Sequence, residues 1–259
     1  MPSPYSYTSL SMFARCPQQY AHRYVWKSPI PEQPLDLYMT CGSVVHTLLE
    51  HAHLAALGNK PVTQENLLES LPGLWEQTLK ESPIPISPEE ALPFVQKSIA
   101  NVEWYFQTHF EAEKKVTIDV EKRIMYPLNP GRKQWLMGFL DRVSKPQDRK
   151  LVVHDYKTGA LTLSSKTLGN DFQATLYGAM AAHQYAPLQE VELQWHYLSH
   201  GKTVTTLLEP ENAREAVGKA QHIADGIESH KQVGLFPPKV GRHCGNCEFI
   251  TMCPAHAQR

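Results

Sequence analysis

The chain lacks the features that mark membrane-spanning and secreted proteins. No segment approaches the roughly 18 consecutive apolar residues that a membrane-spanning helix needs, although 42% of the 259 residues are hydrophobic. The first residues, Met1-Pro2-Ser3-Pro4-Tyr5, have neither the basic nor the apolar region of a signal peptide. We therefore expect a soluble, cytoplasmic protein with a sizeable buried core and no membrane partner.

Excess charge, internal repeats, low-complexity tracts and a nucleotide-binding loop are also missing. A net charge of −1 gives no general attraction to nucleic acid, so any affinity for DNA must come from local basic patches. Gly201-Lys202-Thr203 resembles the end of a P-loop, but His196 stands where the first glycine is required. The sequence therefore gives no support to a P-loop ATPase.

Segments of helical and strand-like periodicity follow one another in an order typical of a mixed α/β domain. The expected helices are 6–27, 42–57, two within 62–112, 171–185 and 211–231. The expected strands are 115–126, 134–143, 150–156, 191–199 and 203–208. We predict one domain over residues 1–259, in which a helical insertion at 58–112 shapes a cleft.

Asp155-Tyr156-Lys157 ends the strand-like run 151–154, and Asp141 lies in the preceding expected strand. Side chains two apart on a strand share a face, so Asp155 and Lys157 point the same way. Two carboxylates at neighbouring strand ends suit Mg²⁺ or Mn²⁺, which prefer oxygen ligands. The Lys157 ammonium could orient a water or neutralise charge developing on a phosphate. Alternatively, Asp155 and Lys157 form an ordinary ion pair before the next turn.

Three further groups could ligate the same metal. A neutral imidazole such as that of His46 binds divalent ions, although a hydrogen-bonded helix histidine is the simpler interpretation. His46 could instead join Glu50 and His53, at helical spacing, in a separate zinc site. The backbone carbonyl of Tyr156 is a plausible ligand. Glu121 could bind the metal, support a ligand or face solvent.

Other polar and aromatic side chains could contact DNA. Gln173 and Tyr177 lie one turn apart on an expected helix and share a face, from which they could position a water or a phosphate. Their alternative is a polar contact at the rim. Aromatic residues near N-terminal basic residues could stack on bases or belong to the core. These are Tyr5, Tyr7, Tyr20, Tyr24 and Trp26.

Four of the five cysteines form a set with metal-binding spacing. They are Cys16, Cys244, Cys247 and Cys253. In a reducing cytosol such a set favours metal over disulfides. Four thiolates can hold a [4Fe–4S] cluster or zinc, and free thiols near a disordered tail are the alternative. A metal would tie the tail 236–259 to Cys16, a closure worth about 5 kcal/mol of chain entropy. We expect Cys41 to be a buried apolar residue.

Taken in order, these residues resemble the RecB-type branch of the PD-(D/E)XK nuclease superfamily. The matching segments are 9–20, 42–46 (Gly-x-x-x-His), 138–143, 153–159 and 173–177 (Gln-x-x-x-Tyr). The cysteine pattern resembles the iron–sulfur version of this family, found in AddB-type recombination nucleases and CRISPR adaptation nucleases. The resemblance covers nearly the whole chain, except the insertion at 58–112.

The resemblance implies a restriction-endonuclease-like mixed central sheet flanked by helices, with a helical insertion and a C-terminal four-cysteine clasp. It favours iron–sulfur over zinc, which the number of thiolates leaves open. The residues to which it assigns roles are His46, Asp141 and Asp155 at the metal, Lys157 in catalysis, and Gln173 and Tyr177 in support of the site.

The function implied by the resemblance is divalent-metal-dependent cleavage of DNA, as an exonuclease on single strands or ends, in DNA repair, recombination or CRISPR adaptation. The AddB-type relatives carry helicase modules that this sequence lacks, so we expect a stand-alone nuclease or a subunit of a larger assembly. One alternative is a non-catalytic DNA-end-binding subunit of a nuclease or helicase assembly. Another is a cysteine-rich redox or zinc protein with no role in nucleic-acid chemistry.

Overall fold

The structure, a computed structural model, describes residues 4–256. The chain forms two compact units, which we describe separately. The central unit comprises residues 32–124 and 139–213. The terminal unit comprises the residues before 32, residues 125–138 and the residues after 213. No described helix is both long enough and apolar enough to cross a membrane.

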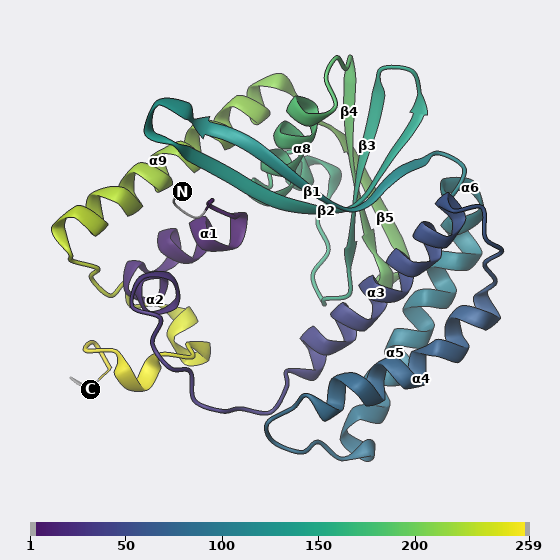
Figure 1. Ribbon diagram of the computed structural model, residues 1–259, viewed down its shortest axis with the longest axis horizontal. Coiled ribbons are helices and arrows are strands. Elements are labelled where there is room, and N and C mark those ends of the chain that lie inside the picture. The colour runs from purple at the N-terminus through teal and green to yellow at the C-terminus, as the bar shows by residue number, and fades with distance from the viewer. Residues whose placement is uncertain (1–3, 257–259) are drawn as a thin grey trace. The chain divides into compact units, whose positions relative to one another are not determined.

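A five-stranded mixed sheet runs through the described part of the chain, in the order β1-β2-β3-β4-β5 (Figure 1). Its strands are β1 Thr117–Asn129, β2 Gln134–Gln147, β3 Lys150–Lys157, β4 Glu190–Tyr197 and β5 Lys202–Leu207. β3 pairs antiparallel with β2 and parallel with β4, and β4 pairs antiparallel with β5. All five strands were expected, and Gly201 allows the tight β4–β5 turn because its φ is +55°.

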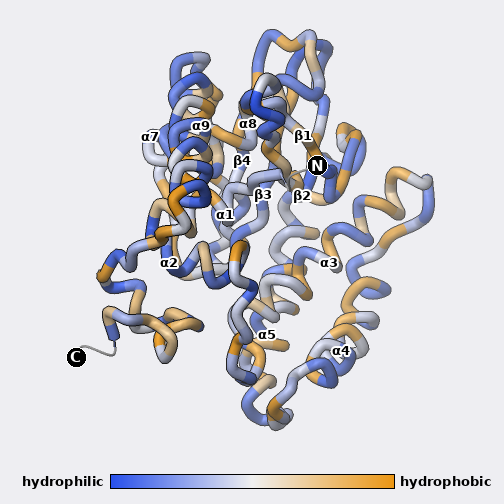
Figure 2. Tube along the Cα trace, turned by 60° about the vertical axis from the view of Figure 1, so that its left-hand side comes forward, coloured by the Kyte–Doolittle hydropathy of each residue, from blue (hydrophilic) through white to orange (hydrophobic). Residues whose placement is uncertain are grey.

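Three helices of the central unit pack side by side (Figure 1). They are α3 Leu37–Leu57, α4 Gln64–Lys80 and α5 Pro88–Tyr105. The core between them contains Leu48, Leu49, Trp75, Tyr105 and Phe110. Buried residues recur every four positions along α4, and Figure 2 shows polar and apolar stretches alternating there. The two helices expected within 62–112 are thus α4 and α5, and α5 begins at Pro88 behind the Ser87 N-cap.

Helix α3 begins five residues before its expected start at residue 42. The Asp36 side chain caps it by accepting hydrogen bonds from the backbone N–H groups of Tyr38 (2.9 Å) and Met39 (3.2 Å). The extra turn carries two exposed side chains, Tyr38 and Met39, whose exposure hides the helical periodicity at this end. A π-helical turn, Phe106–Phe110, and the short α6, Glu111–Glu113, follow α5.

The β3–β4 connection contains α7, Ser165–Leu168, and α8, Phe172–Gln184. Asp171 caps α8 by accepting a hydrogen bond from the Ala174 N–H. Gly178 permits close packing on the sheet, since a Cβ there would lie 2.8 Å from Leu193 Cδ2 of β4. This packing fixes the helix that carries Gln173 beside the end of β3.

The terminal unit contains α1 Tyr7–Arg15, α2 Pro17–Tyr20, a π-helical turn Ala21–Val25 and most of α9 Pro210–Val233. Ser6 and Ser9 form a capping box at the start of α1, and the extended Cys16 and Pro17 divide the expected helix 6–27 into α1 and α2. The Tyr5 backbone pairs with the adjoining part of β2, with hydrogen bonds of 2.8 Å to Trp135 O and 2.7 Å from Met137 N. Two 3₁₀ turns, Arg242–Asn246 and Ile250–Met252, complete the cysteine tail.

Candidate active site

Three potential metal ligands converge in the central unit from three different elements. They are His46 of α3, Glu121 of β1 and Asp141 of β2, each half-buried, with ligand atoms all within 4.8 Å of one another. Mg²⁺ binds oxygen at about 2.0–2.1 Å in octahedral geometry, so its ligands lie roughly 3–4 Å apart. The three groups therefore fit a small divalent cation.

The orientation of His46 leaves one ring nitrogen for a cation. Its Nε2 lies 2.8 Å from the carbonyl oxygen of Tyr156, which can only accept, so Nε2 carries a proton. Nδ1 then faces Asp141 Oδ2 at 3.5 Å. That same oxygen accepts a 2.8 Å hydrogen bond from the Tyr156 N–H. Two acceptors facing each other require a proton or a metal ion between them.

The charges around His46 agree with this geometry. Burial acts to lower the pKa of His46, but the Asp141 and Asp155 carboxylates outweigh it and the net shift is upward. The ring thus favours a positive charge at Nδ1. The role of the Tyr156 carbonyl as a metal ligand stays a prediction, because this oxygen here accepts the His46 hydrogen bond.

Buried Asp155 and half-buried Lys157 form an ion pair beside this cluster, with Lys157 Nζ 2.8 Å from Asp155 Oδ2. Burial, with Asp141 nearby, raises the pKa of Asp155 to about 6 although Lys157 lowers it. Among the described residues, Asp155 is not one of the three whose ligand atoms lie within 4.8 Å. The ion pair predicted as the alternative is therefore present, and it lies next to the potential metal site.

Helix α8 provides a second contact to the Lys157 ammonium, besides that of Asp155. Lys157 Nζ donates a 3.2 Å hydrogen bond to Gln173 Oε1, and Gln173 also bonds Tyr177. Burial together with the Asp155 and Asp141 carboxylates raises the pKa of Tyr177 to about 12. The expectation that Gln173 and Tyr177 share a face is confirmed, and that face lies toward Lys157.

Glu121 has a backbone conformation that the sequence does not reveal. Its φ is +45°, in the left-handed region that non-glycine residues rarely adopt. Such a residue within a strand breaks the simple alternation of faces, as bulges do. Burial, followed by the Asp141 charge, raises the pKa of Glu121 to about 7. Glu121 therefore belongs to the carboxylate cluster and does not face open solvent.

The separate zinc site suggested by helical spacing is wrong for the described structure. His53 is fully buried, with Nε2 2.8 Å from the Tyr105 hydroxyl. Burial lowers its pKa to about 3. Glu50, by contrast, lines the cleft that contains His46. The side chains of Glu50 and His53 thus belong to different environments.

An open cleft of about 600 Å³ contains the cluster. It extends along α3 and over the end of β3. Its lining residues are Tyr38, Met39, Gly42, Ser43, His46, Thr47, Glu50, Glu121, Tyr156, Lys157, Thr158 and Gly159. The cleft is long enough to accept more than a single phosphate group, because it spans more than three turns of α3.

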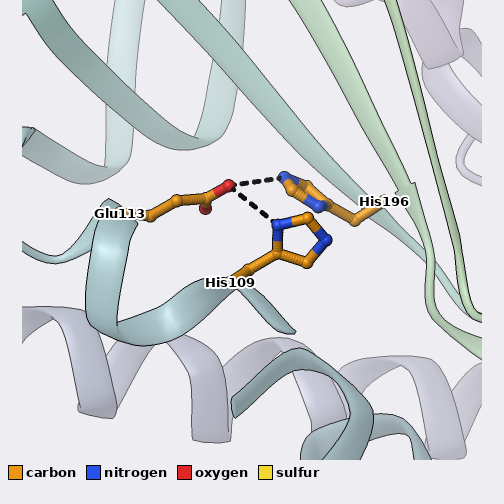
Figure 3. Close-up of side chains that lie close together, drawn as sticks. All are labelled: His109, Glu113 and His196. Atoms are coloured by element: carbon orange, nitrogen blue, oxygen red, sulfur yellow. Dashed lines mark ion pairs between the residues drawn. The ribbon is translucent and has the colours of Figure 1, made fainter. Parts of the chain in front are cut away.

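A second group of metal-binding residue types lies within the central unit, with His196 buried and His109 and Glu113 half-buried (Figure 3). Glu113 Oε1 lies 3.3 Å from His109 Nδ1 and 3.9 Å from His196 Nε2. The other oxygen of Glu113 already binds the guanidinium of Arg142. His109 and Arg142 outweigh the effect of burial and lower the pKa of Glu113 to about 2. We interpret this group as an ion-pair network, because the Arg142 cation neutralises the carboxylate.

This network anchors the backbone that carries the candidate active site. Fully buried Arg142 donates to the Tyr156 hydroxyl at 2.9 Å and to His154 Nδ1 at 2.6 Å. Arg142, His154 and Tyr156 are all buried. Each is next to a predicted site residue in its strand, and its side chain therefore points to the opposite face of the sheet. Those site residues are Asp141, Asp155 and Lys157. Apart from a polar character unusual in buried strands, the sequence gives no signal of this network.

The four predicted cluster cysteines line one cavity of the terminal unit, of about 50 Å³. None forms a disulfide. Backbone N–H groups of Lys239 and Gly241 point at Cys16 Sγ and Cys244 Sγ, each at 3.4 Å. Hydrogen bonds of this kind favour thiolates that ligate a metal. Cys41 is buried in the central unit, as expected for an apolar residue.

Comparison of the chain with protein family models identifies its superfamily. Residues 4–254 match the family model of the PD-(D/E)XK nuclease superfamily. The chain belongs to this superfamily. Among curated proteins, none shows a significant match to the chain. Membership confirms the superfamily predicted from the motifs and supports a divalent-metal-dependent nuclease, a hydrolase of nucleic acid.

One solved structure agrees with the fold of this PD-(D/E)XK protein. It resembles an exonuclease candidate from Eubacterium rectale, with a TM-score of 0.58 and 11% identity over 99% of this chain and 88% of that one. A second solved structure, SSO0001, is 14% identical over 99% of this chain and 88% of its own. Its TM-score of 0.46 is too low to support an argument about the fold. The first match confirms the restriction-endonuclease-like fold with a mixed sheet flanked by helices.

Proposed function

We propose that this PD-(D/E)XK protein is a divalent-metal-dependent DNA exonuclease that acts on single strands or DNA ends. The observation that carries the proposal is the convergence of His46, Glu121 and Asp141 within 4.8 Å, next to the Asp155–Lys157 pair. An imidazole, acidic oxygens and an ammonium around one point suit hydrolysis of a phosphodiester.

The residues would divide the work as follows. His46, Glu121 and Asp141, with Asp155 beside them, would hold Mg²⁺ or Mn²⁺, which when bound supplies a Lewis acid for the phosphoryl group. Lys157 stays charged, because the carboxylate of Asp155 outweighs burial and raises its pKa. Two of its three donors bind Asp155 and Gln173, and the third can bind a phosphate oxygen or orient the attacking water.

Gln173 completes this arrangement. Its Oε1 accepts from Lys157 Nζ at 3.2 Å, so the ammonium is held between a carboxylate and an amide at fixed positions. Pre-organised charge of this kind contributes more to catalysis than a mobile lysine would. We propose that Gln173 and Tyr177 position Lys157 and do not themselves touch the phosphate.

The electrostatics favour catalysis over simple binding of DNA ends. Glu121, Asp141 and Asp155 gather negative charge at the place where a phosphate would lie, and like charges repel. A binding-only subunit has no use for this repulsion, whereas a bound cation removes it. The non-catalytic DNA-end-binding subunit is therefore the weaker alternative.

Digestion of labelled DNA tests the proposal. Single- and double-stranded DNA carrying a 5′ or a 3′ label is incubated with the purified protein and Mg²⁺ or Mn²⁺. We expect stepwise shortening of single strands or ends that EDTA abolishes. Binding of DNA without cleavage, over a range of metals and ends, would instead support the end-binding subunit.

We propose in addition that Cys16, Cys244, Cys247 and Cys253 hold a [4Fe–4S] cluster. A tetrahedral zinc ion, with Zn–S bonds of about 2.3 Å, would bring its sulfur ligands to about 3.8 Å from one another. Within residues 4–256, no three of these sulfurs lie within 4.8 Å of one another. A [4Fe–4S] cluster binds each cysteine through a different iron and holds the sulfurs further apart.

Spectroscopy and metal analysis of anaerobically purified protein test the cluster. We expect a brown protein with broad absorption and about four irons per chain, as thiolate-bound clusters of this type have. A colourless protein with one zinc per chain would contradict the proposal.

The setting that we propose is DNA repair, recombination or CRISPR adaptation. We propose that the chain acts there as a single nuclease domain, alone or beside partner proteins of these pathways.

A further inference from the structure

One face of α3 forms the wall of the candidate active-site cleft. The residues that line the cleft recur every four positions along the helix. They are Tyr38, Gly42, His46 and Glu50. Tyr38 therefore lies on the same face as His46, two turns closer to the helix N-terminus, in a single continuous cleft.

Tyr38 and Met39 are unusually exposed for large apolar side chains, at 69% and 70%. Neighbouring exposed apolar side chains mark binding sites more often than isolated ones do. Both line the cleft that contains His46 and Lys157. They form an apolar patch at one end of a cleft whose other residues are mainly polar.

The Tyr38 ring is held in place although it is exposed. The rings of Tyr38 and Phe94 form a T-shaped pair, with centroids 4.9 Å apart and planes at 87°. Lys97 Nζ lies 5.7 Å from the Tyr38 ring centroid. A fixed aromatic ring with a cation beside it matches the way proteins bind single-stranded nucleic acid, by base stacking and attraction of phosphates.

We propose that Tyr38 is a stacking platform for a base of single-stranded DNA whose backbone runs along α3 to the metal site. The inference rests on the proposed nuclease function and adds a substrate subsite to it. Met39 would extend the apolar surface, and Lys97 would attract a neighbouring phosphate. A paired base presents no free face to Tyr38, so the subsite favours single strands over intact duplex.

The geometry of the helix gives the position of the stacked base. Eight residues separate Tyr38 from His46, which corresponds to about 12 Å along the axis at 1.5 Å per residue. A stacked strand advances about 3.4 Å per nucleotide. The stacked base therefore lies about three to four nucleotides from the phosphate at the metal, and closer where the strand is extended. Gly42, between them, allows α3 to approach the residue that follows β3, since a Cβ there would lie 3.1 Å from Thr158 Oγ1.

The N-terminal aromatic residues fit this role less well than Tyr38 does. Tyr5 and Tyr20 are buried, so stacking by these two is wrong. Tyr24 and Trp26 are more exposed but belong to the terminal unit, and they do not line the cleft of the central unit. Of the aromatic residues considered for stacking, only Tyr38 lines the same cleft as His46.

The test is an abasic-site scan combined with substitutions. Single-stranded oligonucleotides carry one abasic nucleotide at each of the positions next to the cleaved bond, and cleavage is measured with Mn²⁺. The proteins compared are wild type, Tyr38→Ala, Tyr38→Phe and Leu92→Ala. Leu92 is an exposed apolar residue of α5 that does not line the cleft, so it controls for general loss of surface hydrophobicity.

We expect Tyr38→Ala to raise KM by about 5- to 150-fold, the range for loss of one stacked base, with a smaller effect on kcat. Tyr38→Phe keeps the ring and should stay near wild type, as should Leu92→Ala. One abasic position should impair wild type strongly and Tyr38→Ala hardly at all. A flat scan of an active wild-type protein, or an unchanged KM in Tyr38→Ala, would overturn the inference.

Failure of the nuclease proposal would look different, because wild type would then cleave nothing. Equilibrium binding of the same oligonucleotides then decides the role of Tyr38. Weaker binding by Tyr38→Ala, restored by Tyr38→Phe, supports the platform, and equal binding by all four proteins contradicts it. Circular dichroism confirms that the variants are folded.

Discussion

Replacing Glu113 by glutamine removes the only carboxylate that we find paired with the buried guanidinium of Arg142 in residues 4–256. The pKa of Glu113 lies near 2, against an ordinary value of 4.5, because His109 and Arg142 outweigh burial. This lowering of the Glu113 pKa corresponds to about 3 kcal/mol. Breaking buried ion pairs by removal of one partner costs a similar amount, about 3–5 kcal/mol. We therefore expect Glu113→Gln to lower the free energy of unfolding by about 3 kcal/mol at pH 7.

The pH dependence of this loss follows from the direction of the shift. A carboxyl group with a depressed pKa in the folded state stabilises fully above its unfolded value, here about 4.5. The stabilisation disappears as the pH falls toward the folded value, about 2. The difference between wild type and Glu113→Gln should therefore shrink between pH 4.5 and 2.

Urea unfolding followed by circular dichroism measures this difference, and the neighbouring Glu111 provides a matched control. Glu111 is exposed and pairs with Lys114 at 2.6 Å, an interaction worth no more than about 1 kcal/mol. Glu111→Gln should therefore unfold close to wild type. If Glu113→Gln lost no more stability at pH 7 than Glu111→Gln, the ion-pair network would not have the weight that we assign to it.

Three other predictions address the metal site, the network and the cluster. Folded-state pKa values near 6 for Asp155 and 7 for Glu121 lie above their ordinary values, so at pH 5 both carboxyls hold protons that a bound cation must displace. Mn²⁺ should therefore raise Tm more at pH 7 than at pH 5, and an equal shift at both would contradict this. Tyr156→Phe removes the hydroxyl that accepts from Arg142 and should cost about 1–3 kcal/mol in urea unfolding while DNA cleavage persists; inactive but folded protein would count against it. Cys253→Ser should lose iron and lower Tm, and retained iron with an unchanged Tm would speak against the cluster.

The sequence predicts the parts of the site that depend on local pattern. Asp155 and Lys157 share a face because they are two apart on a strand, and the structure pairs them at 2.8 Å. Gln173 and Tyr177 share a helix face for a similar reason. The motifs also predict the superfamily, because each motif occupies a fixed position on the sheet or on the helices beside it.

What the sequence does not predict depends on long-range packing or on local backbone conformation. The positive φ of Glu121 decides where its carboxylate points, and alternation alone cannot show it. The early start of α3 depends on the Asp36 cap, and the first turn that it adds brings Tyr38 into the cleft. Glu113 meets Arg142 across 29 positions of sequence, so no short motif could reveal this pair.

Cleavage of labelled single-stranded DNA in Mn²⁺ by wild type and Asp155→Ala, side by side, tests the proposed active site most directly. Asp155 pairs with Lys157 beside the potential metal ligands, so its removal should abolish cleavage while circular dichroism shows an intact fold. Unchanged metal-dependent cleavage by pure, folded Asp155→Ala would contradict the assignment of this site.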